Sequence, residues 1–131
     1  MSTVLCHGCF DILHIGHVLH FEEAREMGDS LIVTITADGY IKKEGRPIFN
    51  HWLRKKMIEA LRIVDEVGII FDESGAPGIL TIQPAVYVKG VDYRDVGINA
   101  IEAAACKKVG ARVAFTGSPK FSSSELVRYF R

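Results

Sequence analysis

The chain has 131 residues, 48% of them hydrophobic, and its 16 Lys and Arg side chains equal its 16 Asp and Glu side chains in number. This composition excludes a disordered chain and predicts one domain, residues 1–131, with a sizeable core. The zero net charge argues against a nucleic-acid binder or a membrane-surface protein, which would carry a basic excess. No apolar run approaches the roughly 20 residues that span a bilayer. Three cysteines argue against a disulfide framework, so we expect a cytoplasmic protein.

Apolar runs alternate with helical patterns along the whole chain. In chain order, we expect a strand at 3–7, a helix at 17–27, a strand at 30–37, a helix after Asn50, a strand at 66–71, a helix at 78–83, a strand at 85–89, a helix at 98–109, a strand at 111–115 and a helix at 124–130. This alternation predicts a doubly wound α/β fold, in which helices cover both faces of a parallel sheet. Ligands of such sheets bind beyond the carboxyl ends of the strands.

Two helices carry signals for their ends and their buried faces. Gly28 suits the left-handed position that ends the first helix. Asn50 can cap the second helix. The apolar stripe expected to face the core in that helix consists of Leu53, Met57, Ala60 and Leu61.

The segment from Gly8 to His17, GCFDILHIGH, leaves the first strand and enters the first helix. The free N–H groups and the positive dipole end of a helix N-terminus favour phosphate. Gly8 and Gly16 let the backbone approach a ligand without a Cβ in the way. Because His14 and His17 are three positions apart, we expect both imidazoles to face one site and to donate to phosphate oxygens.

This segment resembles the signature of the H-I-G-H nucleotidylyltransferase superfamily, G-x-F-D-x-x-H-x-G-H, at every fixed position. The resemblance implies transfer of a nucleotide monophosphate from a nucleoside triphosphate to a phosphorylated small-molecule acceptor, with release of pyrophosphate. It implies that His14 and His17 stabilise charge around the α-phosphate and on the leaving group. It also implies a Rossmann-like sheet of five parallel strands in the order 3-2-1-4-5, and a homodimer. The nucleotide-binding residues implied in this segment are Gly8, Cys9, Phe10, Asp11 and Gly16.

Positive charge is concentrated between Lys42 and Lys56. This segment contains six basic side chains and one acidic side chain, Glu44. This segment has a net charge of +5 in 15 residues, so the rest of the chain carries −5. The family has basic residues in the corresponding loop, which implies catalytic roles for Lys42 and Lys43 on the phosphates. Arg54 matches an arginine that the family uses on phosphate. The family's Mg²⁺ is held mainly by the nucleotide phosphates, so no protein ligand of the metal is expected.

Two segments of the C-terminal half indicate the branch of the family. The sequence VKGVDY, which includes Lys89, Gly90 and Asp92, resembles the V-K-G-x-D-Y segment of heptose-1-phosphate adenylyltransferase domains and implies nucleotide binding. The run Ser122, Ser123 and Ser124 opens the last helix, where the family binds nucleotide phosphates; the same hydroxyls can also cap that helix. Glycerol-3-phosphate cytidylyltransferases carry Arg-Thr-Glu-Gly-Ile before this point, and that arginine is absent here.

The leading hypothesis is therefore transfer of AMP from ATP to a sugar 1-phosphate, supplied by a separate sugar kinase. The alternative is a cytidylyltransferase that uses CTP and a polyol or sugar phosphate. A third class is a non-catalytic nucleotide-binding or metal-binding module, since Cys6 and Cys9 form a C-x-x-C followed by His14 and His17. Cys6 lies at a strand position typical of a core thiol, and Cys9 lies at a variable position of the family motif.

Overall fold

The computed structural model of the chain describes residues 2–117. The expected helix at 124–130 and the serine run at 122–124 lie outside the described residues. The strands are β1 (Thr3–Gly8), β2 (Ser30–Thr36), β3 (Glu66–Ile70), β4 (Val86–Lys89) and β5 (Arg112–Phe115). The helices are α1 (Ile15–Arg25), α2 (His51–Glu59), α3 (Ala76–Ile82) and α4 (Ala100–Val109), with two 3₁₀ turns at Asp38–Tyr40 and Val91–Tyr93.

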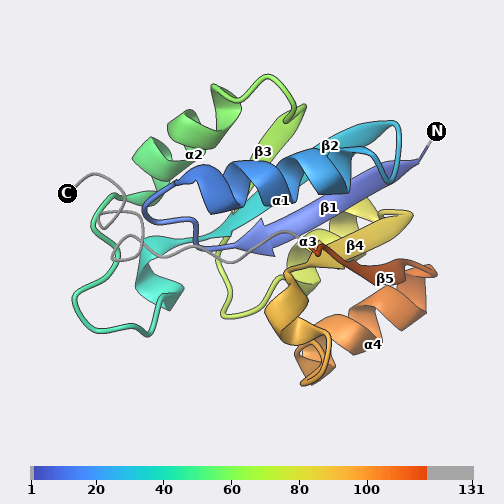
Figure 1. Cartoon of the computed structure of the whole chain (residues 1–131). Helices are drawn as coiled ribbons and strands as arrows, with labels where there is room; N and C mark the ends of the chain where they lie inside the picture. Colours follow the sequence, from blue (N-terminus) through green and yellow to red (C-terminus); the bar gives the residue numbers. More distant parts are fainter. Residues whose placement is uncertain (1, 118–131) are drawn as a thin grey trace.

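The five strands form one parallel sheet in the order β3-β2-β1-β4-β5, which confirms the expected doubly wound topology. Figure 1 shows α1 and α2 on one side of the sheet and α3 and α4 on the other. Successive side chains of β1 therefore point to opposite faces of the sheet and pack in two separate hydrophobic cores. Val4 and Cys6 pack with Phe21 of α1, whereas Leu5 packs with Ile79 of α3. No helix among residues 2–117 is long and apolar enough to cross a bilayer.

The end of α1 differs from the sequence prediction. The helix begins two residues earlier than expected, after the N-cap residue His14, and its C-cap is Glu26 in a right-handed conformation. Gly28 is not left-handed, so the prediction of its role was wrong. Gly28 instead provides room for the first strand, because a Cβ there would lie 2.7 Å from Val4 Cγ2.

The buried face of α2 also differs from the prediction. Asn50 caps this helix as expected, since its Oδ1 accepts a hydrogen bond from the N–H of Leu53 at 3.0 Å. The buried residues, however, are Arg54 and Ile58, while Leu53 and Met57 are about half exposed. A helix turns about 100° per residue, so with Arg54 buried the side chains of Leu53 and Met57 face outward. Leu53, Met57 and Ala60 line a groove of about 530 Å³ beside residues 10–13. Leu61, beyond the end of α2, packs against the core as expected.

Candidate active site

The candidate site lies where β1 ends and α1 begins, at the carboxyl edge of the sheet. Phe10 has a left-handed backbone with φ 47°, an uncommon conformation for a residue other than glycine. Its ring packs edge-on against His17 and Phe21, at 5.2 and 5.0 Å between centroids. A Cβ on Gly8 would lie 2.9 Å from Phe10 Cζ. Gly8 therefore leaves room for the phenyl ring that supports His17.

The two motif histidines cap α1 together. Gly16 N donates to His14 Nδ1 at 3.1 Å, and His14 N donates to His17 Nδ1 at 3.2 Å. The two rings are stacked, with centroids 4.0 Å apart. A nitrogen that accepts a hydrogen bond from a backbone N–H carries no proton, so each neutral ring has its proton on Nε2. Both Nε2 atoms are thereby left as donors for a ligand.

The same environment keeps these rings neutral. Burial, followed by electrostatic repulsion from the neighbouring imidazoles of His14 and His20 in their protonated forms, lowers the pKa of His17 to about 4. Burial also lowers the pKa of His14. At neutral pH the pair therefore presents hydrogen-bond donors without a positive charge, and a bound anion would shift both pKa values back upward.

Asp11 of the motif contacts the protein itself. Its carboxylate is buried and accepts from Arg46 Nε, from Ile48 N at 2.8 Å and from Phe49 N at 3.0 Å. Burial alone would raise the pKa of Asp11, but these donors lower it below its ordinary value. Asp11 thus fastens the end of the basic loop, residues 46–49, to the strand-to-helix turn.

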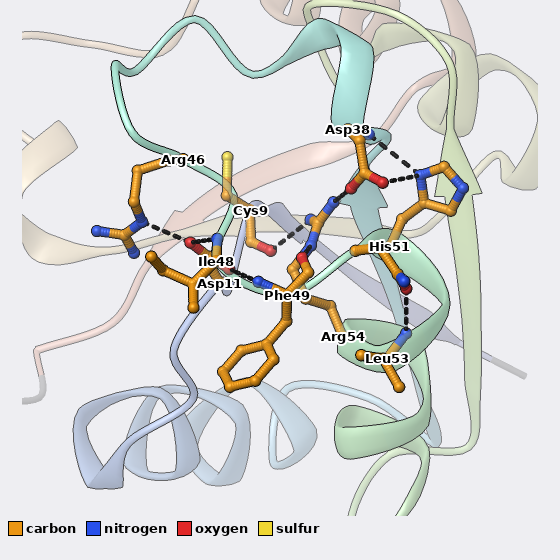
Figure 2. Close-up of polar contacts among 10 residues, drawn as sticks. Cys9, Asp11, Asp38, Arg46, Ile48, Phe49, His51, Leu53 and Arg54 are labelled. Carbon is orange, nitrogen blue, oxygen red and sulfur yellow. Dashed lines mark hydrogen bonds and ion pairs between the residues drawn. The ribbon is translucent and has the colours of Figure 1, made fainter.

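Arg54 closes the same loop from the other side, as Figure 2 shows. The arginine is 1% exposed, and its guanidinium donates to Asp38 Oδ1 at 2.7 Å and to the carbonyl oxygens of Cys9 and Phe49, both at 2.9 Å. Asp38 also contacts His51 Nδ1, at 3.3 Å from Oδ2. The sequence predicted an arginine facing phosphate. The structure places Arg54 inside the protein, bound to three segments of the chain.

The two lysines of the basic loop lie at the surface. Lys42 Nζ is 2.9 Å from Glu73 Oε1, with both side chains mostly exposed, and Lys43 is exposed. An exposed pair of this kind contributes little to stability. These lysines can therefore move toward a phosphate at small energetic cost, unlike Arg46 and Arg54.

The segment after β4 lies at the same edge of the sheet. Lys89 Nζ donates to the His7 carbonyl oxygen at 3.4 Å and lies 4.7 Å from the centre of the Tyr93 ring. Gly90 follows directly and leads into the 3₁₀ turn Val91–Tyr93, which contains Asp92. The structure therefore brings the predicted residues after β1, β2 and β4 to one edge.

Asp38 and His7 were not among the residues predicted from the sequence. Asp38 is the acidic residue closely following β2, and its position at a carboxyl end was the available signal. His7 is buried, with Nδ1 2.9 Å from Thr34 Oγ1 and Nε2 3.3 Å from Thr36 Oγ1. Burial lowers the pKa of His7, so the ring is neutral and has one protonated nitrogen. One threonine hydroxyl therefore accepts from the ring and the other donates to it.

The two cysteines of the C-x-x-C segment differ in burial, and they do not form a disulfide. Burial raises the pKa of Cys6 to about 12, and Cys6 packs in the core beneath α1, whereas Cys9 is exposed. Across residues 2–117, no group of three or more His, Cys, Asp or Glu side chains is arranged to hold a metal ion.

The chain is similar to several known proteins. Residues 5–128 match the family model described as cytidylyltransferase-like. The bifunctional protein HldE of Aliarcobacter butzleri is 47% identical over 95 residues, which is 70% of this chain and 20% of that protein. The bifunctional protein HldE of Campylobacter jejuni is 40% identical over 107 residues, 76% of this chain and 23% of that protein. The chain thus spans about a fifth of the length of these curated relatives.

Solved structures share the fold. A lipopolysaccharide core biosynthesis protein from Thermoplasma volcanium superposes with a TM-score of 0.76 at 25% identity, over 92% of this chain and 99% of that one. A pantothenate synthetase from Thermus thermophilus superposes with a TM-score of 0.61 at 13% identity, over 95% of this chain and 58% of that one. The second likeness concerns the fold alone.

Proposed function

The chain belongs to the cytidylyltransferase-like family of nucleotidyltransferases, and we propose that it transfers AMP from ATP to a sugar 1-phosphate with release of pyrophosphate. The observation that carries this proposal is the pair of neutral imidazoles at the N-terminus of α1, both with Nε2 free to donate. The HldE relatives and the resemblance of VKGVDY to heptose-type enzymes support the sugar phosphate and the adenine base.

The reaction needs no covalent enzyme intermediate. An oxygen of the acceptor phosphate attacks the α-phosphorus, the bond from that phosphorus to the bridging oxygen breaks, and pyrophosphate leaves with the electron pair. Negative charge grows around the α-phosphate and on the leaving group, so donors placed there in advance stabilise the transition state more than the substrates. We assign that role to His14 and His17.

The sheet order supports a division of the site into two halves. Segment 89–92, which we propose binds the nucleotide, follows β4 on one side of β1. Lys42 and Lys43 follow β2 on the other side, where they would reach the acceptor phosphate or the triphosphate. His14 and His17 follow β1, between the two halves. The two substrates would therefore meet at the histidines, and the lysines would offset the repulsion between their phosphates.

The remaining predicted ligands keep supporting roles in this proposal. Gly16 would permit close approach of the phosphates, and Gly8 would act through the room it leaves for Phe10. The serines at 122–124, outside the described residues, would bind the phosphates as the family resemblance implies. Mg²⁺ would enter with the triphosphate and neutralise its charge, because residues 2–117 offer no cluster of ligands for a protein-bound metal. Asp11 and Arg54 would act on the substrates indirectly, by holding the basic loop.

The biological setting is proposed on the same basis. Because the relatives are named bifunctional and are about three and a half times as long as this chain, a second activity accompanies this unit in those proteins. We propose that a separate sugar kinase supplies the sugar 1-phosphate here, that the chain forms a homodimer, and that it works in the cytoplasm, where its free cysteines would stay reduced.

The deciding experiment is pyrophosphate release measured with ATP, CTP, GTP and UTP against a panel of sugar 1-phosphates and polyol phosphates. We expect turnover with ATP and a sugar 1-phosphate. Turnover with CTP and glycerol 3-phosphate would instead establish the cytidylyl alternative. Absence of pyrophosphate with every pair, from a protein that binds ATP, would establish a non-catalytic nucleotide-binding module.

A further inference from the structure

A buried carboxylate on α4 holds a turn on the opposite face of the sheet from α1. Glu102 is 5% exposed, and its Oε1 accepts from the Tyr87 hydroxyl at 2.7 Å. Its Oε2 accepts from the N–H of Gly75 at 2.8 Å. Burial and the Glu102 carboxylate raise the pKa of Tyr87, so the phenol stays protonated and donates. Burying a carboxylate is costly unless it is well bonded, and here both oxygens are used.

Gly75 belongs to the turn between β3 and α3, and this turn is packed tightly. A Cβ on Gly75 would lie 2.7 Å from His7 Cγ and 2.9 Å from Tyr87 Oη. The ring of His7 is fixed in turn by its contacts with Thr34 and Thr36 of β2. The turn therefore packs against His7 of β1 and Tyr87 of β4, and the Glu102 carboxylate binds its backbone N–H at Gly75.

The other side of this turn faces the candidate site. The turn follows β3, so it lies at the carboxyl edge of the sheet next to the loop that follows β2. Glu73 in the turn contacts Lys42 of that loop at 2.9 Å. A displacement of the turn would consequently change the surroundings of the lysines on that side of the site, which we assign here to the acceptor phosphate.

We propose that Glu102 is a positioning residue: through the N–H of Gly75 it places the β3–α3 turn against the acceptor half of the site. This role rests on the proposed nucleotidyl transfer. Through Glu73 the turn meets Lys42 of the loop after β2, whereas its contact with β4 is with Tyr87, before the segment 89–92. A displaced turn should therefore weaken use of the acceptor more than use of the nucleotide.

The test measures KM for the acceptor and for ATP separately in Glu102→Leu and Glu102→Gln. Leucine removes both acceptors, and we expect the acceptor KM to rise about tenfold while kcat and the ATP KM stay within about twofold. Glutamine keeps an oxygen for Gly75 and an amide for the tyrosine hydroxyl, so it should restore most of the acceptor affinity. Tyr87→Phe, which keeps the ring, replaces Glu102→Leu if that variant does not fold.

Ile79→Val is the matched control, because Ile79 is fully buried in the same core as Tyr87 and its side chain makes none of these hydrogen bonds. The N–H of residue 79 donates to the Gly75 carbonyl oxygen at 3.2 Å, and valine keeps that bond. It should lower the melting temperature without changing the acceptor KM. Hydrogen exchange of the Gly75 amide, which needs no substrate, should be faster in Glu102→Leu than in Ile79→Val. If the active wild type and all variants share one acceptor KM, the positioning role is wrong. If the wild type releases no pyrophosphate with any pair, the proposed function itself is wrong.

Discussion

Arg54 Nη2 lies 2.7 Å from Asp38 Oδ1, and the whole arginine is shielded from solvent although it belongs to the most basic segment of the chain. The same guanidinium reaches the carbonyl oxygens of Cys9 and Phe49. It therefore joins the motif turn, the end of β2 and the end of the basic loop. A planar group with five donors can make these contacts at once, which a lysine cannot.

Arg54→Lys should therefore act mainly on folding. The substitution keeps the charge but leaves buried acceptors without donors, and we expect the free energy of unfolding to fall by about 3 kcal/mol. Urea denaturation measures this change. If Arg54 instead contacts phosphate as the family resemblance implied, the free energy of unfolding would be unchanged in Arg54→Lys, and its affinity for ATP would fall in a salt-dependent way.

Asp11→Ala should loosen the basic loop. Three donors from residues 46–49 lose their shared acceptor, and we expect a loss of about 2 kcal/mol in the free energy of unfolding. The measurement is urea denaturation, together with proteolysis within 39–49.

Lys55→Ala is the control for that variant, because Lys55 pairs with Glu59 one helical turn away on the exposed part of α2. Loss of such a pair should cost less than about 0.5 kcal/mol. Equal losses in the two variants would show that Asp11 contributes no more than a surface ion pair.

The arrangement of His14 and His17 predicts different effects of two amide replacements. Glutamine places its NH₂ near the position of Nε2, whereas asparagine places it near Nδ1. Because Nδ1 of each ring already accepts from the backbone, we expect His17→Gln to retain more turnover than His17→Asn. His14→Ala and His17→Ala should each lower kcat at least about 100-fold in the pyrophosphate assay. A normal melt with full activity in either alanine variant would contradict the assignment.

The buried His7 predicts a loss of stability in mild acid. Burial, helped by the positive charge of Lys89, lowers the pKa of His7 from its ordinary 6.5 to about 4. Between these values the unfolded chain binds a proton that the folded chain does not, so stability falls as pH falls from 6.5 toward 4. We expect this residue to account for roughly 2 kcal/mol between pH 7 and pH 5.

Urea denaturation of wild type and His7→Gln at both pH values measures that contribution. The variant should be less stable at pH 7, because Thr34 loses its partner at the position of Nδ1, but it should lose less stability on acidification. Parallel losses in both proteins would mean that other groups, His17 among them, carry the acid sensitivity.

The order of strands and helices was predictable from the sequence, because periodic burial and helix caps depend on residues close together in the chain. The motif from Gly8 to His17 was predictable for the same reason, and with the family resemblance it indicated the topology and the class of reaction. Leu53 and Met57 of the α2 stripe were predicted wrongly as core residues, because hydrophobic spacing alone cannot reveal that Arg54 is buried with hydrogen-bond acceptors around it.

The tertiary structure alone decided what the charged residues of the site do. Asp11 finds its donors 35 to 38 positions away, and Arg54 reaches Cys9 across 45 positions. Glu102 meets Gly75 across 27 positions. A carboxylate or guanidinium has the same local sequence signal whether it faces a phosphate or a buried backbone group. Only the folded chain, which supplies the partner and excludes water, determines which of these two roles it takes.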